Sequence, residues 1–501
     1  MDYKKLQNGS DIRGVAMEGV PGQTVNLTGE AARRIGAAFV VWLLSVTGKQ
    51  HITVSIGRDS RLTGEALTDE IVRGVTGQGA DIVDFGLAST PSMFMSTVMD
   101  GYEFDGAMML TASHLPFNRN GVKFFTPRGG LEKADITEIL RLAESGAFSS
   151  AVQGRVTKQD FLSVYAAHLV DTVRRQVCAA DYNHPLAGFH IVVDAGNGAG
   201  GFYVDRVLAP LGADTAGSQY LEPDGRFPNH APNPEDPAAM DAIAGCVLKN
   251  KADFGIIFDT DVDRAGAVLP DGKELNRNRL IALISAVVLE EHPGTTIVTD
   301  SITSTGLAAF IAEKGGVHRR FKRGYRNVIN ESIRLNELGQ DSQLAIETSG
   351  HGALKENYFL DDGAYLITKL LIRMARCRAE GCAIGELIAS LAEPAESVEV
   401  RMAIRSDDPL TYGGRILSEL SEYAEAAGWT TAKENFEGVR IEFPPHEGNG
   451  WFLLRMSLHD PLMPLNIESD EPGGVPIIAG KLRAFLSRYP LLDTEKLDQL
   501  Q

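Results

Sequence analysis

The chain has 501 residues, and a prior of about 150 residues per domain predicts three or four domains rather than one small module. Hydrophobic residues make up 44% and charged residues 23%, which is typical of a folded globular protein and excludes a long disordered tract. The net charge of −18 argues against nucleic acid or an anionic membrane surface as a partner, so an anionic ligand would need a local basic pocket.

The cysteine usage and the N-terminal segment both favour a cytoplasmic protein. The four cysteines include no CxxC pair and are too sparse for a disulfide framework, so we expect reduced thiols at Cys178, Cys246, Cys377 and Cys382. The N-terminus lacks the apolar core of a signal peptide. The most apolar stretch, residues 37–46, has about half the length of a membrane span.

Three pairs of short apolar runs, each ending abruptly in a polar turn, predict one unit used three times. The first runs end at Ile56, Val193 and Val298, and the second runs end at Leu110, Phe258 and Ile346. Such runs, separated by stretches of helical period, predict buried strands of mostly parallel sheets with helical crossovers. Helices are expected over residues 277–291 and 364–377. Ligand groups gather beyond the carboxyl ends of such strands, so the turns after the second runs are expected to carry chemistry.

The pattern changes after Glu393-Pro394 to shorter, alternating segments, followed by a closing helix around residues 480–487. This change predicts a separate, more antiparallel α+β domain. The predicted domains are therefore 1–155, 156–272, 273–392 and 393–501.

The first candidate loop is Thr111-Ala112-Ser113-His114, which follows the second apolar run. A serine at the end of a buried strand, with Lys123 ten residues further on, is suited to act as a nucleophile or phosphoryl carrier. The same residues are also typical of a Ser/Thr turn that closes a strand. The GxSxG nucleophile elbow is absent, which disfavours a hydrolase triad.

The second candidate loop carries three alternating carboxylates, Asp259, Asp261 and Asp263, followed by Arg264. Several carboxylate oxygens aimed at one point suit a hard cation such as Mg²⁺. An EF-hand is excluded, because its sixth position would be Arg264 rather than glycine and its twelfth Pro270 rather than glutamate. Three carboxylates behind a buried strand would repel one another without a cation, although acidic turns are also common at surfaces.

Three further segments carry weaker signals. In Glu347-Thr348-Ser349-Gly350-His351, a carboxylate and a hydroxyl two residues apart are suited to binding adjacent sugar hydroxyls, or form a polar turn. Five cations between Arg319 and Arg326 are typical either of a solvated face or of a phosphate cleft. Arg455, Ser457 and His459 alternate as a phosphate clamp at a strand end requires, although many strands end in Arg and Ser.

Taken together and in this order, the loops resemble those of the α-D-phosphohexomutase family, the phosphomannomutases and phosphoglucomutases. The family's TASHNPxxxNGxK loop is matched with Leu115 in place of Asn, and its DxDxDR loop is matched in full at Asp259–Arg264. A DIRG segment lies at Asp11–Gly14 and a GRDSR segment at Gly57–Arg61. The resemblance implies three related mixed-sheet α/β/α domains, followed by a smaller α+β domain, around a central cleft.

The resemblance also implies a role for each candidate residue. Ser113 would carry the phosphoryl group and bind Mg²⁺ together with Asp259, Asp261 and Asp263. The positive charges of Lys123, Arg13 and Arg264 would neutralise the transferred group. His114 and His351 are two open candidates for carrying the proton. The sugar hydroxyls would be held by Glu347 and Ser349, and the phosphate that is not being transferred by Arg326, Arg455, Ser457 and His459.

The activity implied is the interconversion of hexose 1-phosphate and hexose 6-phosphate, with mannose or glucose as the sugar, through a phosphoserine enzyme and a hexose 1,6-bisphosphate. The resemblance further implies Mg²⁺ as cofactor, the bisphosphate as activator, and a monomer or homodimer without a nucleic-acid or membrane partner.

The last loop departs from the family's RxSxTEP, because Leu458, His459 and Asp460 precede Pro461. Binding through His459 would be sensitive to pH near neutrality. The altered loop keeps open a non-catalytic sugar-phosphate binder. Two further alternatives stay open: a phosphoglucosamine mutase, and a haloacid-dehalogenase-like phosphotransferase with Asp259 as nucleophile, because an apolar strand followed by DTDV fits that class. Glucosamine enzymes commonly have Gln where this chain has Thr348, which favours a hexose phosphate.

Overall fold

The computed structural model describes residues 2–146, 148, 153–457 and 460–500. The chain divides into two compact units. Unit 1 comprises Met1–Asn276 and Ser349–Glu386, and unit 2 comprises Arg277–Thr348 and Leu387–Gln501. Among the described residues, no helix is long and apolar enough to cross a membrane.

Unit 1 begins with a mixed eight-stranded sheet in the order β1-β2-β6-β5-β3-β4-β8, with β7 paired to β6. Its strands are β1 (Gln7–Asn8), β2 (Asp11–Val15), β3 (Thr53–Arg58), β4 (Asp81–Leu87), β5 (Gly106–Leu110), β6 (Arg119–Thr126), β7 (Gly129–Gly130) and β8 (Val156–Lys158). The central strands β5, β3, β4 and β8 run parallel, whereas β6, β2 and β1 join in antiparallel fashion.

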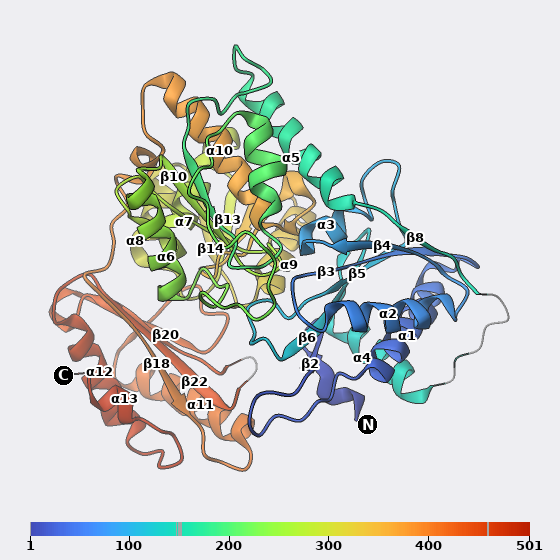
Figure 1. Ribbon diagram of the computed structural model, residues 1–501. Helices are drawn as coiled ribbons and strands as arrows, with labels where there is room; N and C mark the ends of the chain where they lie inside the picture. Colours follow the sequence, from blue (N-terminus) through green and yellow to red (C-terminus); the bar gives the residue numbers. More distant parts are fainter. Residues whose placement is uncertain (1, 147, 149–152, 458–459, 501) are drawn as a thin grey trace. The chain divides into compact units, whose positions relative to one another are not determined.

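Helices flank this first sheet (Figure 1). They are α1 (Gly29–Thr47), α2 (Gly64–Thr76), α3 (Thr90–Met95) and α4 (Lys133–Ser145), preceded by the 3₁₀ turn Tyr3–Leu6. The apolar side chains of α1, α2 and α4 share one buried cluster with strand residues such as Val54, Ile56 and Met108. The apolar stretch 37–46 therefore lies within α1, a helix that packs on a sheet.

A second, four-stranded sheet in unit 1 has the order β12-β11-β10-β9. Its strands are β9 (Ile191–Asp194), β10 (Phe254–Phe258), β11 (Ala265–Val268) and β12 (Glu274–Leu275). The helices of this region are α5 (Phe161–Val177) and α6 (Pro237–Asn250). A short π turn at Val204–Leu208 is followed by a 3₁₀ turn at Ala209–Leu211. Strands β9 and β10 are parallel, and β10 turns back into antiparallel β11 through the acidic loop. Residues 349–386 add β16 (Gly352–Leu354), β17 (Leu360–Asp361) and α10 (Gly363–Glu380), with 3₁₀ turns at Lys355–Asn357 and Ile384–Ile388.

Unit 2 contains a parallel set of strands in the order β14-β13-β15 and an antiparallel five-stranded sheet in the order β18-β22-β21-β20-β19. The parallel strands are β13 (Thr296–Thr299), β14 (Val317–Arg320) and β15 (Ser342–Ile346), with α7 (Arg277–Glu291), α8 (Thr305–Glu313) and α9 (Tyr325–Glu337). The antiparallel strands are β18 (Glu396–Ala403), β19 (Thr430–Thr431), β20 (Val439–Phe443), β21 (Gly450–Leu454) and β22 (Leu462–Ser469). The helices of this region are α11 (Pro409–Ala426), α12 (Gly474–Leu486) and α13 (Glu495–Asp498), with a 3₁₀ turn at Pro445–Glu447.

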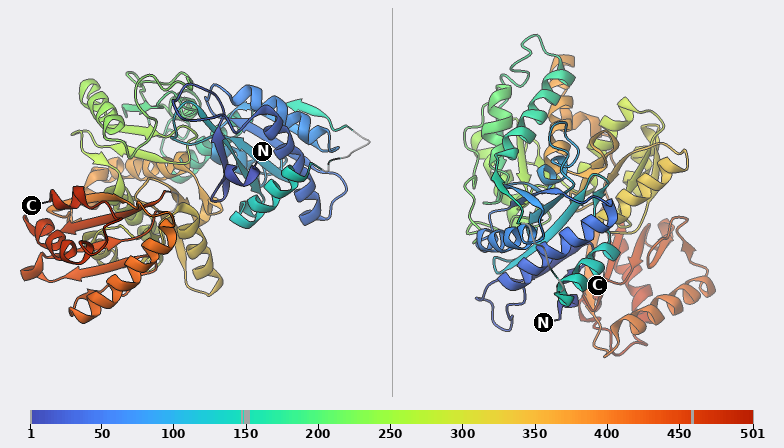
Figure 2. Two further views of the ribbon diagram at one scale, coloured as in Figure 1. Left: turned by 90° about the horizontal axis from the view of Figure 1, so that it is seen from below. Right: turned by 90° about the vertical axis from the view of Figure 1, so that its right-hand side faces the viewer.

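The antiparallel sheet is coloured red and orange in Figure 2. Successive side chains along its strands belong to opposite faces of the sheet. Ile441, Phe452 and Ile467 share a buried cluster with residues of α11 and α12. Their neighbours Arg440 and Trp451 belong to the opposite face, where the Arg440 guanidinium lies 3.6 Å from the centre of the Trp451 ring. The alternating pattern after residue 394 therefore reports a real antiparallel sheet with one helix-covered face.

The predicted fold class is confirmed, with three α/β/α regions and a C-terminal region built on an antiparallel sheet. Each predicted strand pair forms two adjacent parallel strands: β3 with β5, β9 with β10, and β13 with β15. The predicted helices correspond to α7, α10 and α12. The three domain boundaries and the central cleft stay predictions. Strand β8, just after the boundary predicted at 155, pairs with β4 of the first sheet.

One helix contact yields a test of the packing. A Cβ added at Gly74 in α2 would lie 2.0 Å from the backbone oxygen of Arg33 in α1, whereas a Cβ at Gly245 in α6 would meet nothing within 4 Å. Gly74→Ala should therefore force the two helices apart and destabilise the protein by about 1–3 kcal/mol. Gly245→Ala should stabilise it by about 0.5–1 kcal/mol through helix propensity. Thermal unfolding of both variants checks this, and shifts of the same sign would contradict the packing.

Candidate active site

The serine loop leaves the end of β5 in a strained conformation. Ser113 has a φ of +50°, a region that residues other than glycine adopt rarely, and it is buried. Its backbone N–H donates to the Thr111 hydroxyl over 2.9 Å. Such strain persists only where the surroundings enforce the conformation, and it is concentrated at functional sites.

Arg61 binds the backbone carbonyls of this loop. Its guanidinium donates to the carbonyls of Leu115, Pro116 and Arg119 at 2.7, 2.9 and 3.0 Å, and to that of Ser113. The side chain is buried and also forms an ion pair with Asp59, with 3.3 Å between Nε and Oδ2. One fixed, planar fork thus binds four carbonyls of one loop, which a lysine ammonium cannot do.

Three carboxylates lie in the tight turn between β10 and β11. The side chains of Asp259, Asp261 and Asp263 are buried, and their ligand oxygens lie within 4.8 Å of one another. Val262 within the turn has a φ of +67°, a second strained position. Thr90 donates from its hydroxyl to Asp261 over 2.5 Å.

Two buried cations compensate the three carboxylates. The Lys123 ammonium donates to Asp261 over 3.1 Å and also to Asp263. The Arg264 guanidinium lies 3.1 Å from Asp259 and 4.0 Å from Asp263. Two positive charges against three negative ones leave one carboxylate unbalanced.

The imbalance shows in the pKa values of the turn. Burial, followed by the charges of Asp263 and Asp261, raises the pKa of Asp259 well above its usual range. Burial also acts on Asp263, but the nearby charges of Lys123 and Arg264 outweigh it and lower its pKa. The inner oxygens Oδ1 of Asp261 and Asp263 are buried and have no hydrogen-bond partner among the described residues. Unsatisfied carboxylate oxygens at this spacing fit a metal cation.

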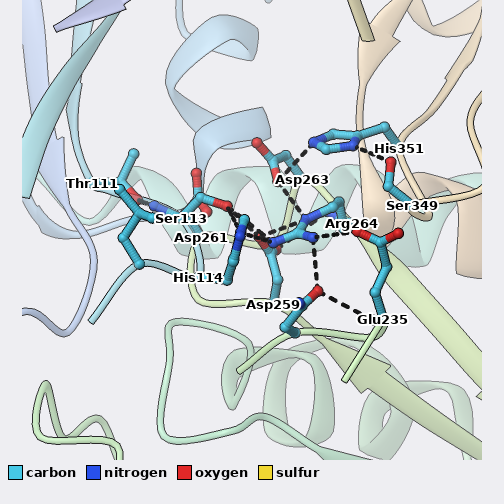
Figure 3. Close-up of polar contacts among 12 residues, drawn as sticks. Thr111, Ser113, His114, Glu235, Asp259, Asp261, Asp263, Arg264, Ser349 and His351 are labelled. Carbon is cyan, nitrogen blue, oxygen red and sulfur yellow. Dashed lines mark hydrogen bonds and ion pairs between the residues drawn. The ribbon is translucent and has the colours of Figure 1, made fainter. Parts of the chain in front are cut away.

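Ser113 lies directly against the acidic turn (Figure 3). Its hydroxyl oxygen lies 3.2 Å from Asp259 Oδ2 and accepts a hydrogen bond from Arg264 Nη2 over 3.0 Å. The structure thus brings together the serine, the acidic triad, Lys123 and Arg264, as the sequence predicts. Asp259 and Arg264 both touch the atom that would carry a phosphoryl group.

The two histidine candidates both lie close to this centre. His114 Nδ1 lies 3.3 Å from the Ser113 hydroxyl and accepts from Arg264 Nη2 over 2.8 Å. Burial of its ring, followed by the charges of Arg264 and Arg13, lowers the pKa of His114 to about 3. His351 Nδ1 lies 2.8 Å from the Ser349 hydroxyl, and its Nε2 lies 3.8 Å from Asp263. Burial and the charges of Arg264 and Lys123 lower the pKa of His351 well below its usual range, so both rings are neutral near neutral pH.

Asn233 and Glu235 also contact the centre, although the sequence analysis did not single them out. Arg264 Nη1 donates to the Asn233 side chain over 2.8 Å and lies 3.9 Å from Glu235. They hold the guanidinium that reaches Ser113. The only signal in the sequence was the Pro-Asn-Pro-Glu turn, which is typical of many loops. Arg13 lies on the serine side, where it donates to Asp11 over 3.0 Å and to the carbonyl of Ala112 over 3.4 Å.

The remaining candidates, apart from Ser349, belong to unit 2. Glu347 at the end of β15 is buried, and its carboxylate accepts from the backbone N–H of Gly324 over 2.5 Å. Gly324 has a φ of +114°, which explains why a glycine stands there. The next residue, Thr348, donates from its hydroxyl to Asp300 over 2.7 Å. The chain passes from unit 2 to unit 1 after Thr348, so Glu347 and Ser349 belong to different units.

The predicted phosphate clamp begins at the end of β21. Arg455 is buried, and burial followed by the charge of Arg323 lowers its pKa. The backbone N–H of Ser457 donates to the carbonyl of Leu462 over 2.9 Å. The Ser457 hydroxyl accepts from the backbone N–H of Asp460 over 3.3 Å. Arg326 lies in the first turn of α9. His459 lies outside the described residues.

The chain is similar to phosphohexomutases along almost its whole length. Family models of the phosphoglucomutase/phosphomannomutase α/β/α domains I, II and III match residues 4–150, 164–272 and 276–394. A phosphoglucomutase of Neisseria gonorrhoeae is 30% identical over 485 residues, and a phosphomannomutase/phosphoglucomutase of Pseudomonas putida is 30% identical over 482 residues. Each alignment covers 96% of both chains.

Solved structures agree with these relatives. A phosphoglucomutase/phosphomannomutase family protein of Burkholderia thailandensis aligns with a TM-score of 0.78 at 27% identity, covering 97% of this chain and 98% of its own. The N-acetylphosphoglucosamine mutase of Aspergillus fumigatus, crystallised with GlcNAc-6P and magnesium, aligns with a TM-score of 0.55 at 12% identity, covering 91% and 96%. At that identity the second comparison shows the fold alone.

The hydrogen bonds of Arg61 yield a prediction for the serine loop. Arg61→Lys keeps the positive charge beside Asp59 but loses the fork that binds four carbonyls. Hydrogen bonds of a charged donor contribute about 1.5–3 kcal/mol, so amide exchange over residues 111–121 should become about ten- to a hundredfold faster. Arg58→Lys is the matched control, because the Arg58 guanidinium has no hydrogen bond among the described residues. Equal exchange in both variants would contradict the role given to Arg61.

Proposed function

Because this chain belongs to the phosphoglucomutase/phosphomannomutase family, we propose that it interconverts hexose 1-phosphate and hexose 6-phosphate, with glucose or mannose as the sugar, through phospho-Ser113 and a hexose 1,6-bisphosphate. The observation that supports this proposal most is that the Ser113 hydroxyl contacts both a carboxylate and the guanidinium of the acidic loop. Ser113 Oγ lies 3.2 Å from Asp259 and 3.0 Å from Arg264.

The proposed cycle moves one phosphoryl group in each half-reaction. The bond between phosphorus and Ser113 Oγ breaks while a sugar hydroxyl forms the new bond to phosphorus, and the proton of that hydroxyl passes to a base. The bisphosphate turns round, and its other phosphoryl group returns to Ser113. Lys123 and Arg264 stabilise the negative charge of the transferred group, since phosphoryl transfer depends mainly on positioning and electrostatics.

His114 and His351 both stay candidates for the base. A neutral imidazole accepts a proton, and both rings are held neutral by burial and by nearby cations. The Nδ1 atom of His114 already accepts from Arg264. The Nδ1 atom of His351 lies against Ser349, and its Nε2 faces Asp361 at 3.6 Å.

The residues of the acidic turn fit Mg²⁺, which Asp259, Asp261 and Asp263 would hold together with the phosphorylated Ser113. When bound, Mg²⁺ supplies positive charge to the oxygen atoms of the transferred group. The two inner carboxylate oxygens without hydrogen bonds support this assignment. Binding requires the charged carboxylate of Asp259, and the raised pKa makes that form less available as the pH falls.

The proposal assigns substrate recognition to six residues outside the acidic turn. Glu347 and Ser349 bind sugar hydroxyls, and Arg326, Arg455, Ser457 and His459 bind the phosphate that is not transferred. Arg455 is buried and its Nε has no hydrogen-bond partner among the described residues, which supports an anion-binding role. A hexose 1,6-bisphosphate as activator and a monomeric or homodimeric state complete the proposal.

The family assignment argues against the haloacid-dehalogenase alternative, in which Asp259 would be the nucleophile. In this structure the Asp259 carboxylate accepts from the backbone and side chain of Arg264 at 3.2 Å each, which positions it as a charge partner. Members of the family act on different sugar phosphates, so the substrate assay includes the phosphates of glucose, mannose and glucosamine.

The central test is the variant Ser113→Ala. We expect the purified wild-type protein to carry one phosphate on Ser113, to lose it to sugar phosphate, and to convert glucose, mannose or glucosamine 1-phosphate in a coupled assay with glucose or mannose preferred. Ser113→Ala should lose at least about a thousandfold in kcat, the scale on which enzymes lose a covalent step. Ser285→Ala is the control, because the Ser285 hydroxyl is buried in α7 without a hydrogen-bond partner among the described residues.

Equal activity of wild type and Ser113→Ala would overturn the mechanism. A wild-type protein that no hexose bisphosphate can phosphorylate would instead support the non-catalytic binder.

Mg²⁺ should stabilise the protein through the acidic turn. At a concentration about a hundred times its Kd, a ligand of the native state stabilises by about 2.7 kcal/mol, so Mg²⁺ should raise the thermal midpoint of the wild type. Asp261→Asn should abolish the shift, and Asp271→Asn, in an exposed turn, should keep it. The shift should shrink as the pH falls through the raised pKa of Asp259, because the protonated carboxyl is a poor ligand. An undiminished shift in Asp261→Asn would contradict this site.

A further inference from the structure

The C-terminus of α10 ends in a motif that places two thiols side by side. Gly381 adopts a φ of +82°, its N–H donates to the carbonyl of Arg378 over 3.2 Å, and the N–H of Cys382 donates to the carbonyl of Cys377 over 2.9 Å. This pair of bonds is a Schellman motif. The motif brings together the side chains four residues before its glycine cap and one residue after it, and here both are cysteines, Cys377 and Cys382.

A carboxylate completes the cluster. The Cys377 and Cys382 sulfur atoms and one oxygen of Glu380 all lie within 4.8 Å of one another. Cys382 Sγ lies 3.9 Å from Glu380 Oε2. In a tetrahedral zinc site, bonds of about 2.3 Å to sulfur and about 2.0–2.2 Å to oxygen separate neighbouring ligand atoms by about 3.5–3.8 Å. The separation of Cys382 and Glu380 is therefore already close to that in a metal site, and the other two separations do not exceed 4.8 Å.

The charges around the cluster balance for a divalent cation. Arg373 Nη1 donates to Glu380 Oε2 over 2.9 Å. Two thiolates and one carboxylate carry three negative charges, which a divalent cation and the Arg373 guanidinium neutralise. A guanidinium bound to a ligating carboxylate is also typical of the groups that orient metal ligands. In addition, the negative end of the α10 dipole favours a cation at this place.

Solvent reaches the cluster through two of its three residues. Cys377 is buried, Cys382 is half-buried and Glu380 is exposed. An ion can therefore enter past Glu380 and Cys382. An apolar contact alone would satisfy a Schellman motif, and it requires neither a second thiol nor the adjacent carboxylate.

We propose that Cys377, Cys382 and Glu380 form a binding site for a thiophilic divalent cation of the Zn²⁺ or Cd²⁺ type, with water as the fourth ligand. On binding, both thiols lose their protons to solvent and two metal–sulfur bonds form. The ligand set differs from the all-oxygen acidic turn, which suits Mg²⁺. The site is therefore separate from the proposed phosphoryl-transfer centre and does not depend on it.

The test is a titration of the full-length, reduced protein with Cd²⁺ and with Co²⁺ in excess Mg²⁺, so that the acidic turn is saturated. We expect one equivalent to produce a thiolate-to-metal charge-transfer band in the ultraviolet, and Co²⁺ to add the intense visible bands of a tetrahedral site. Cys382→Ser and Cys377→Ala should lose the charge-transfer band or weaken binding at least a hundredfold. Glu380→Gln should keep the band and bind about ten- to a hundredfold more weakly.

Cys246→Ser is the matched control, because Cys246 is a buried helical cysteine outside every candidate metal cluster of the described residues. Far-ultraviolet circular dichroism shows that each variant is folded. Absence of the band in the wild type, or its retention in both Cys382→Ser and Cys377→Ala, would overturn the proposal. Mutase activity of Cys382→Ser should equal that of the wild type, and a parallel loss of metal binding and activity would overturn the separation of the two sites.

Discussion

The burial of three carboxylates in the turn after β10 is the constraint on which the site depends. Isolated buried carboxylates are costly, and the turn exists because Lys123 and Arg264 are buried with it. Lys123 comes from β6 of the first sheet and the acidic turn from the second sheet, so the ion pairs join two domains of unit 1. The two cations leave one negative charge of the turn uncompensated, so the turn is suited to a further cation.

The serine is placed by a second constraint of a different kind. Its left-handed backbone is unfavourable by itself, and Arg61 opposes the cost by binding the carbonyls of the loop. Gly121 contributes in the same region, because a Cβ there would lie 2.2 Å from the backbone oxygen of Ile12. The electrostatics of the acidic turn and the geometry of the serine loop are thus set by different residues, and they meet at one hydroxyl oxygen.

Much of this was predictable from the sequence because it depends on local pattern. Apolar runs that end in polar turns predicted the parallel strand pairs, and the spacing of Asp259, Asp261 and Asp263 predicted a carboxylate cluster. The role of Arg61 was not predictable, because its four partners lie more than fifty residues away in sequence and are backbone atoms. Asn233 was missed for a similar reason, since it acts only by holding Arg264. Pairing of Cys377 with Cys382 required the left-handed turn at Gly381, which the spacing of five positions between the two cysteines does not reveal.

The four predicted domains do not coincide with the two compact units. Contacts within unit 2 explain why most of the third domain groups with the fourth. Arg440 of β20 is buried and donates to the carbonyls of Ser301 and Thr303 at 2.7 and 3.2 Å, so the antiparallel sheet is fixed to the loop after β13. The backbone N–H of Arg323 donates to Glu437 over 2.9 Å, next to Gly324, the residue that binds Glu347. Glu347 and the proposed phosphate clamp at Arg455 are therefore parts of one compact unit.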